Sequence, residues 1–221
     1  MCACIGTDFQ GAVVSSAFED RPERAGYRRS AGSPRGEARR LELLGRVTDD
    51  LAANGLVDFS LRRAARAAGA THKVLLYHFD GIDDLLRQAI VQLRERRVDK
   101  AFTAATAGQP RRPLADWVRV VWPVLVGEEA RVLDQAIGLA MYDPGRHGAL
   151  GREASQQYLP LLLSICPEHW PQRRKLEVAE MILAVLRGFL VDARTSGDSA
   201  GIAAGFEALG RALEREEAAE E

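Results

Sequence analysis

The amino-acid sequence predicts an all-α protein, and three features of it lead to that prediction. Apolar residues recur every three or four positions in nearly every segment between residues 37 and 215, which is the period of a buried helix face. No convincing run alternates apolar and polar residues in the way that a half-buried strand does. Turn residues such as Asn54-Gly55 and Ser196-Gly197-Asp198 separate the periodic segments, so short loops are expected to join the helices.

The composition is that of a globular, water-soluble chain. Of the 221 residues 47% are hydrophobic and 28% are charged, which is ordinary for such proteins. The three cysteines, Cys2, Cys4 and Cys166, cannot pair completely within one chain, so we expect reduced thiols. No stretch approaches the roughly 20 apolar residues of a membrane span, and no secretory signal pattern is present. We therefore expect a cytoplasmic protein, and no cofactor or metal is predicted.

Charge is unevenly distributed, although the formal net charge is only −1. Residues 21–40 contain seven arginines and two glutamates, a net charge of +5, whereas residues 101–221 contain 13 basic and 17 acidic side chains, a net charge of −4. A basic front end suits contact with a polyanion. Residues 1–36 lack periodicity and are predicted to form a disordered basic arm. A mis-assigned start or a solubilising tail explains this arm as well as a function does.

Residues 37–81 are predicted to form a unit of three helices. The first helix ends before Asn54-Gly55, and its apolar face consists of Leu41, Leu44, Val47 and Leu51. Ser60 is placed to cap a short second helix, which Gly69 ends, and Thr71 is placed to cap a third that runs to about His78. A connecting helix over residues 82–102 follows, with an apolar stripe from Ile82 to Leu93.

The third helix divides into two faces when its side chains are placed at 100° intervals. Leu75 and Phe79, with Leu76 beside them, are expected to pack against the preceding helices. Lys73 and Tyr77 lie on the other face, flanked by His72 and His78. In a helix-turn-helix the second helix enters the major groove with its N-terminal residues at base edges, and Arg62, Arg63 and Ser60 would then hold the phosphate backbone. The alternative is an ordinary helix pair with a solvated arginine face.

The run from Arg39 to Leu86, centred on FSLRRAARAAGATHKVLLYHFDGIDDLL, resembles the N-terminal domain of TetR-family transcriptional regulators. The matching positions are Ser60, Ala65, Ala68-Gly69, Thr71, Leu75, His78-Phe79 and Leu85. The resemblance implies a homodimer on a palindromic double-stranded DNA operator, usually a repressor that a small-molecule ligand releases. Together with the polarity of the helices it predicts DNA contact by ten residues: Arg39, Ser60, Leu61, Arg62, Thr71, His72, Lys73, Val74, Tyr77 and His78.

Two departures from the family pattern affect the expected DNA contacts. Leu76 stands where the family often has tyrosine, so phosphate contact would pass to Tyr77 and His78. Ile82 stands where lysine is usual, and Asp83 and Asp84 follow it. Those carboxylates suit the start of a helix but would repel nearby phosphates. Backbone affinity is therefore expected to depend on the arginine-rich arm.

Residues 103–221 are predicted to form a second helical domain, which begins at the composition break TAATAGQPRRP. Its helices are expected at residues 114–126, 128–142, 149–165, 173–194 and 199–215, with bends or ends at Pro123 and Pro160. The resemblance implies that the last two helices pair with their copies in a dimer, through Leu186, Leu190, Ile202, Phe206 and Leu209. The alternative is that both helices complete the core of one subunit.

The ligand site is less defined by the sequence. A cavity between helices is expected to be lined by Trp117, Trp122, Gln135, Met141, Tyr142 and Phe189, with His147 as a second polar candidate. The competing functional classes are a small all-α enzyme and a helical adaptor that binds only protein. The sequence has no His-Glu-x-x-His, glycine-rich phosphate loop or nucleophile elbow, so we do not expect an enzyme.

Overall fold

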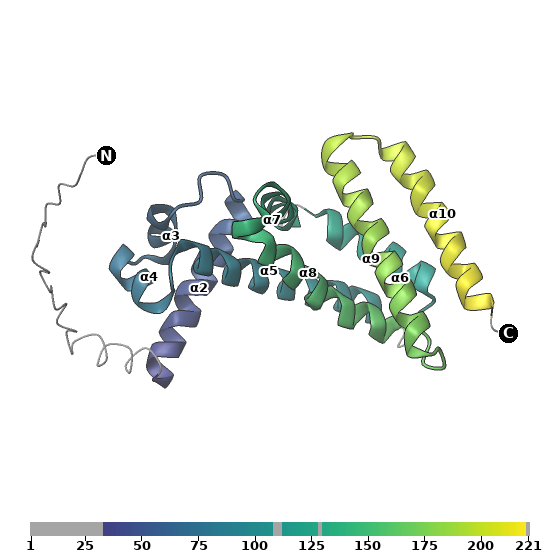
Figure 1. Ribbon diagram of the computed structural model, residues 1–221, viewed down its shortest axis with the longest axis horizontal. Coiled ribbons are helices and arrows are strands. Elements are labelled where there is room, and N and C mark those ends of the chain that lie inside the picture. Colours follow the sequence, from purple (N-terminus) through teal and green to yellow (C-terminus); the bar gives the residue numbers. More distant parts are fainter. Residues whose placement is uncertain (1–32, 108–111, 128–129, 220–221) are drawn as a thin grey trace, which may run out of the picture.

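The computed structural model describes residues 33–107, 112–127 and 130–219, and it confirms the all-α prediction, because no strand occurs among these residues. The helices are α2 (Pro34–Asn54), α3 (Leu61–Ala68), α4 (His72–His78), α5 (Ile82–Thr106), α6 (Leu114–Val126), α7 (Arg131–Tyr142), α8 (Pro144–Ile165), α9 (Gln172–Thr195) and α10 (Ser199–Ala218). Figure 1 places α3 and α4 at one end of the long axis and α10 at the other.

Helix α2 begins earlier than the predicted start at residue 37. The Ser33 hydroxyl accepts a hydrogen bond from the backbone N–H of Gly36 at 3.1 Å, and Pro34 occupies the first turn. A serine cap followed by proline is a strong start signal, which outweighs the polar composition of the segment. The greater part of the predicted arm, residues 1–32, lies outside the described residues.

The first core holds α2, α3, α4 and the beginning of α5 together. Leu43, Val47, Leu51 and Leu75 are fully buried in it. Burial of such side chains stabilises the fold by about 1.5–3 kcal/mol each. Because the core fixes one side of α4 through Leu75, the position of the opposite side of α4 is also fixed.

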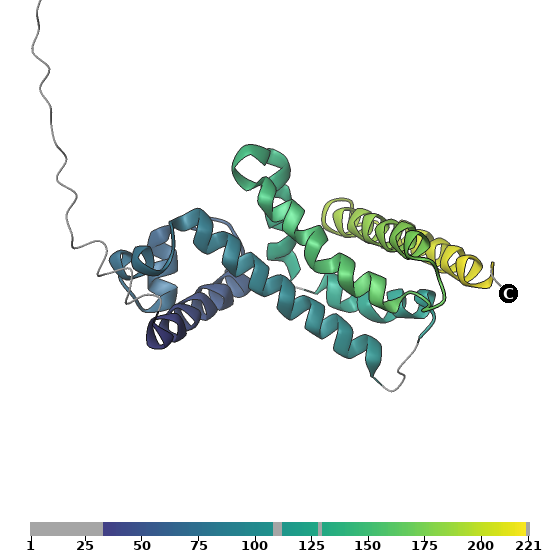
Figure 2. The same ribbon diagram turned by 60° about the horizontal axis from the view of Figure 1, so that its bottom comes forward.

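The predicted boundary at residue 103 does not coincide with the division of the core. Helix α5 continues unbroken to Thr106, and its residues Ala101 and Ala105 belong to the second core. The first core in turn contains apolar residues of the later helices, namely Val132, Leu133 and Ala136 of α7 and Leu150 of α8. The two cores are therefore joined by helices that run from one to the other, as Figures 1 and 2 show for α5 and α8.

The second core lies among α5, α6, α8, α9 and α10. Helix α8 begins at Pro144 and not near residue 149, because the Asp143 carboxylate accepts a hydrogen bond from the backbone N–H of Arg146 at 3.0 Å. The Asp143-Pro144 pair thus ends α7 and starts α8. Pro123 and Pro160 lie inside helices that continue past them. Helices α9 and α10 lie side by side on one flank of the molecule (Figures 1 and 2).

None of the described helices is both long and apolar enough to cross a bilayer. Within the same residues no group of three or more histidine, cysteine, aspartate or glutamate side chains is arranged to hold a metal ion.

Candidate functional site

Helices α3 and α4 form a capped helix-turn-helix. The Ser60 hydroxyl accepts a hydrogen bond from the backbone N–H of Arg63 at 3.3 Å, and the Thr71 hydroxyl accepts one from Val74 at 3.3 Å. Gly69 ends α3 in the left-handed conformation, with φ of 61°, which glycine adopts without steric cost. Local sequence therefore sets the ends of both helices and the turn between them.

The outward side of α4, here called the α4 face, consists of Thr71, His72, Lys73 and Leu76, all of them exposed. Among the described residues, none forms an ion pair or hydrogen bond with the side chains of His72 or Lys73. Leu76 is 52% exposed, so the expectation that it packs beside Leu75 and Phe79 was wrong. A bulky apolar side chain on this face can contact a thymine methyl group or a sugar.

Three predicted contact residues lie nearer the core than expected. Leu61 and Val74 are half-buried and pack against the first core. Tyr77 is half-buried with its ring edge-on to the ring of His78, at a centroid distance of 4.8 Å. Their helical positions are compatible with the edge of a contact surface but not with its centre.

The surroundings of His78 favour the neutral form of its imidazole. Burial lowers the pKa of its imidazole, and the positive charges of Arg39 and Arg40 lower that pKa further. Its Nδ1 atom is buried without a hydrogen-bond partner among the described residues. A neutral imidazole offers a hydrogen bond but no charge to a phosphate.

The arginines near α4 fall into two groups. Arg62 and Arg66 are exposed on α3, and no described residue forms an ion pair with either. Arg63, by contrast, is bonded to the Asp50 carboxylate at 2.7 Å and to the carbonyl oxygens of Val57 and Gly55 at 2.7 and 2.9 Å. The expectation that Arg63 holds a phosphate was therefore wrong, because its donors brace α3 against α2 and the loop between them.

Arg39 lies on α2, half-exposed and paired with Glu42. This hydrogen bond is the largest influence on the pKa of the Glu42 carboxyl, which is lowered. An exposed pair of this kind contributes little to stability. Because the pair is weak, Arg39 can release Glu42 and pair with a stronger anion.

The two carboxylates at the start of α5 are already bound. Asp83 accepts two hydrogen bonds from Arg146, each 2.9 Å long. Burial works to raise the pKa of the Asp84 carboxyl, but hydrogen bonds from Gln88, the backbone of Asp80 and Arg87 lower it overall. The expected repulsion of DNA is reduced because Asp83 is paired with Arg146 of α8 and both carboxylates lie in the first turn of α5, where the helix dipole favours negative charge.

Four side-chain contacts join the α2–α4 region or the first turns of α5 to other helices. Gln135 of α7, predicted as a ligand residue, accepts a hydrogen bond from the backbone N–H of Leu56 at 2.8 Å. Three ion pairs join other segments: Asp83–Arg146, Arg87–Glu153 and Asp49–Arg96. Gln135 therefore holds the loop before α3 and does not face a ligand cavity.

A cavity does lie between α5, α6, α7, α8 and α9, but its lining differs from the predicted one. Of the six predicted residues only Trp117 lines it. Met141 and Tyr142 are 76% and 90% exposed at the end of α7. Trp122 and Phe189 instead form an aromatic cluster with Phe206, with ring centroids 5.2–6.2 Å apart. His147 is half-buried near the start of α8 and is also outside the lining.

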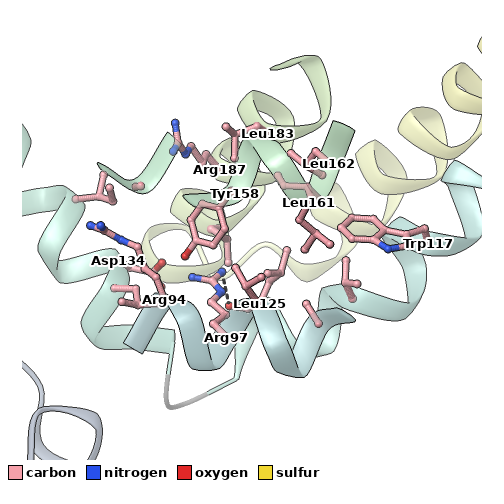
Figure 3. A pocket seen from close by; sticks show the side chains of 18 residues that line it. Arg94, Arg97, Trp117, Leu125, Asp134, Tyr158, Leu161, Leu162, Leu183 and Arg187 are labelled. Atoms are coloured by element: carbon pink, nitrogen blue, oxygen red, sulfur yellow. Dashed lines mark hydrogen bonds between the residues drawn. The ribbon is translucent and has the colours of Figure 1, made fainter. Parts of the chain in front are cut away.

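This cavity, here called the arginine cavity, has a free volume of about 80 Å³ and three guanidinium groups in its lining, those of Arg94, Arg97 and Arg187. Arg94 is 1% exposed and Arg97 is 8% exposed. Burial lowers the pKa of Arg94; Tyr158 and Glu153 oppose this in part, and repulsion by Arg187 and Arg97 adds to the lowering. Figure 3 shows Arg94, Arg97 and Tyr158 gathered toward one end of the cavity and Trp117 at the other.

The sequence did contain a signal for these arginines. Arg97 lies four residues after Leu93 and four before Ala101, both of which are buried on α5. An arginine at this spacing is placed on the buried side of the helix. The predicted lining of aromatic residues with Met141, Gln135 and His147 did not include it.

The predicted dimer residues are used largely within the subunit. Leu186, Leu190 and Leu209 are buried, and Phe206 belongs to the aromatic cluster, while Ile202 is half-buried. The outer surfaces of α9 and α10 instead carry exposed small or apolar residues, namely Ala184, Gly188, Val191, Ala204 and Ala208. A Cβ atom added at Gly188 would meet nothing within 4 Å, so this surface is open at that position.

Comparison with protein-family models found no match, and comparison with curated proteins found none either. Solved structures do match. A candidate transcriptional regulator of Streptomyces coelicolor is 24% identical, with 78% of this chain and 96% of that one covered and a TM-score of 0.57. The multidrug binding protein EbrR is 22% identical, with 81% and 90% covered and a TM-score of 0.58.

A candidate transcriptional regulator of Pseudomonas aeruginosa is 18% identical, with 83% of this chain and 92% of that one covered and a TM-score of 0.57. The matches extend over both the α2–α4 end and the later helices, since each covers more than three quarters of the chain. The chain therefore has the two-part, all-α fold of these regulators.

Proposed function

We propose that this protein is a sequence-specific DNA-binding transcriptional regulator of the TetR type, a repressor that leaves its operator when a small molecule binds. The observation that carries the proposal is the α4 face. His72 and Lys73 stand exposed at the capped start of a helix whose opposite side is fixed in the core by Leu75. Donors at that position are placed to reach base edges in the major groove.

The phosphate contacts are proposed to surround that face. Arg62 and Arg66 on α3 supply exposed charge, and Arg39 on α2 can exchange Glu42 for a phosphate. Tyr77 and His78 at the end of α4 can contribute hydrogen bonds but no positive charge. Such contacts set register and affinity, whereas His72 and Lys73 select sequence.

A homodimer is part of the proposal, because one α4 reads only one half of a palindrome. Two recognition helices must lie about 34–36 Å apart to enter successive major grooves. The exposed small residues of α9 and α10 offer a surface on which two copies can approach closely. This surface, and not the buried Leu186 or Leu209, is the proposed interface.

The route from effector to DNA is proposed to run through α7 and α8. Both helices contribute to the arginine cavity, through Asp134 and Tyr158 for example. They also hold the loop before α3 through Gln135 and the start of α5, directly after α4, through Arg146. A ligand that binds better to one arrangement of these helices shifts the population of α4 spacings. We place this activity in the cytoplasm and assign no catalysis to the chain.

The test is DNA binding by the full chain on fragments recovered from genome-wide pulldown, with the chain's own promoter region included. Lys73→Ala removes a base-edge contact, which is worth about 1–3 kcal/mol, so affinity should fall about 10- to 100-fold. Lys100→Ala removes the same charge from an exposed position on α5 and serves as the matched control. Equal affinity of the Lys73 and Lys100 variants would contradict the proposal.

A further inference from the structure

The three guanidinium groups of the arginine cavity are bonded to neutral oxygens. Arg94 donates to the carbonyl oxygen of Leu150 and to the Gln157 side chain at 3.3 Å. Arg97 donates to the carbonyl oxygen of Leu125 at 3.2 Å, and its guanidinium lies over the Tyr158 ring, 5.7 Å from the centroid. Arg187 donates to the Ser155 hydroxyl at 3.2 Å.

The carboxylates nearby form their ion pairs with other arginines. Asp134, in the cavity lining, is bonded to Arg194 at 3.0 Å. Glu153 acts on Arg94 through space, but its carboxylate is bonded to Arg87 at 2.9 Å. Within the described residues, no carboxylate forms an ion pair with Arg94, Arg97 or Arg187.

Buried cations without a paired anion are costly, and proteins normally pair them or bond them fully. Here one donor is left over as well, because the Nε atom of Arg97 is buried without a partner among the described residues. The cavity therefore offers both uncompensated positive charge and an unused hydrogen-bond donor. One anion with acceptor oxygens would both compensate the positive charge and accept a hydrogen bond from the unused donor.

The remainder of the cavity is apolar. Leucine and valine side chains make up half of its lining, and Leu161, Leu162 and Trp117 extend away from the charged end (Figure 3). A free inorganic anion would occupy the charged end and leave the apolar end of the cavity empty. A molecule with a carboxylate at one end and a hydrocarbon body at the other would fill both parts.

We propose that the arginine cavity binds a small organic monocarboxylate, with its carboxylate at Arg97 between Arg94 and Arg187 and its apolar body toward Trp117. This inference rests on the proposed function, since it names the chemical class of the effector. The free volume of about 80 Å³ favours a short chain or a single ring, and a larger acid would have to move α5, α6 or α8 apart.

The experiment measures binding to the full chain by calorimetry, with hexanoate and benzoate as probes. Hexanamide and benzamide are the matched controls, because they keep the shape and lose the charge. A charge-assisted hydrogen bond is roughly twice as strong as a neutral one, so each acid should bind at least about tenfold more tightly than its amide. Equal affinity of acid and amide, or no binding of either acid at roughly 10 mM, would overturn the inference.

Variants locate the binding group. Arg97→Gln should remove the preference for the acid, while Arg97→Lys should retain part of it because the charge remains. Arg96→Gln deletes the same charge from the preceding position of α5, where the side chain is 42% exposed and paired with Asp49, and should leave the preference for the acid unchanged. An unchanged preference for the acid in Arg97→Gln would contradict the assignment.

The two proposals fail separately. DNA affinity of each variant is measured without any probe. A chain that binds DNA through Lys73 but shows no preference for acids overturns only the effector class. A chain that prefers acids but does not bind DNA overturns only the proposed regulator.

Discussion

The α4 face and the arginine cavity both carry cationic side chains that form no ion pair within the described residues, yet they differ in exposure. His72 and Lys73 are exposed to water, whereas Arg94 and Arg97 are 1% and 8% exposed. In water a single charge is weak and is screened by salt, so useful binding needs many charges along a polyanion. In a low-dielectric cavity a single anion suffices. The environment of the cation, and not its charge alone, thus selects its partner.

Salt should separate the two regions most strongly. A protein that neutralises six to ten phosphates loses about 10³- to 10⁵-fold in affinity between 50 and 200 mM salt. We expect a loss on the order of 10³-fold for the operator, measured by fluorescence anisotropy. Binding of hexanoate, measured by calorimetry over the same range, should change by less than about threefold because the cavity excludes counter-ions. Parallel salt slopes for the two ligands would contradict the comparison.

A pair of leucines on α4 tests which side of that helix faces outward. Leu75 is fully buried and Leu76 is 52% exposed. Leu75→Ala should lower the free energy of unfolding by about 2–5 kcal/mol because it leaves a cavity in the first core. Leu76→Ala should change it by no more than about 0.5 kcal/mol. Chemical denaturation of both variants gives the two values.

The Leu76 variant also has a functional readout. Loss of an apolar contact from the α4 face should weaken operator binding several-fold, about 1 kcal/mol, while helical content remains unchanged. If Leu76→Ala unfolds as readily as Leu75→Ala, the face assignment is wrong.

Periodicity predicted the parts of the fold that depend on local sequence. Leu75 and Phe79 were placed on the buried side of α4, and Ser60, Gly69 and Thr71 were placed at the helix ends where the structure has them. These features follow from spacing and capping within a few residues. Leu76 was misplaced because its angular position lies at the edge of the buried face, where only tertiary packing decides.

The cavity could not be predicted in the same way. Its lining combines side chains from five helices, and aromatic residues were taken as its markers. Trp122 and Phe189 instead pack against each other and against Phe206. Gln135 accepts a hydrogen bond from the backbone of Leu56, 79 positions earlier in the chain. Which polar or aromatic side chains meet is set by helix packing, and spacing within one helix does not report it.

The smallest expected effect concerns His78, which lies between the two environments, half-buried at the end of α4. Burial and the charges of Arg39 and Arg40 lower its pKa below the ordinary histidine value. The unfolded chain therefore binds a proton at a pH where the folded chain does not, so stability is full above about pH 6.5 and declines as pH falls through that value toward the folded pKa.

NMR titration of the His78 ring should show this lowered pKa directly. Arg39→Gln removes one of the two repelling charges and should move the His78 pKa part of the way back, whereas Arg211→Gln, an exposed change on α10, should not move it. In the unchanged chain, the imidazole of His78 begins to gain a proton at mildly acidic pH, within reach of a DNA phosphate. Operator affinity should therefore rise slightly as pH falls toward about 6. A His78 pKa at or above the ordinary value would mean that this ring is solvated like the α4 face, and its placement between the exposed and the buried environment would be wrong.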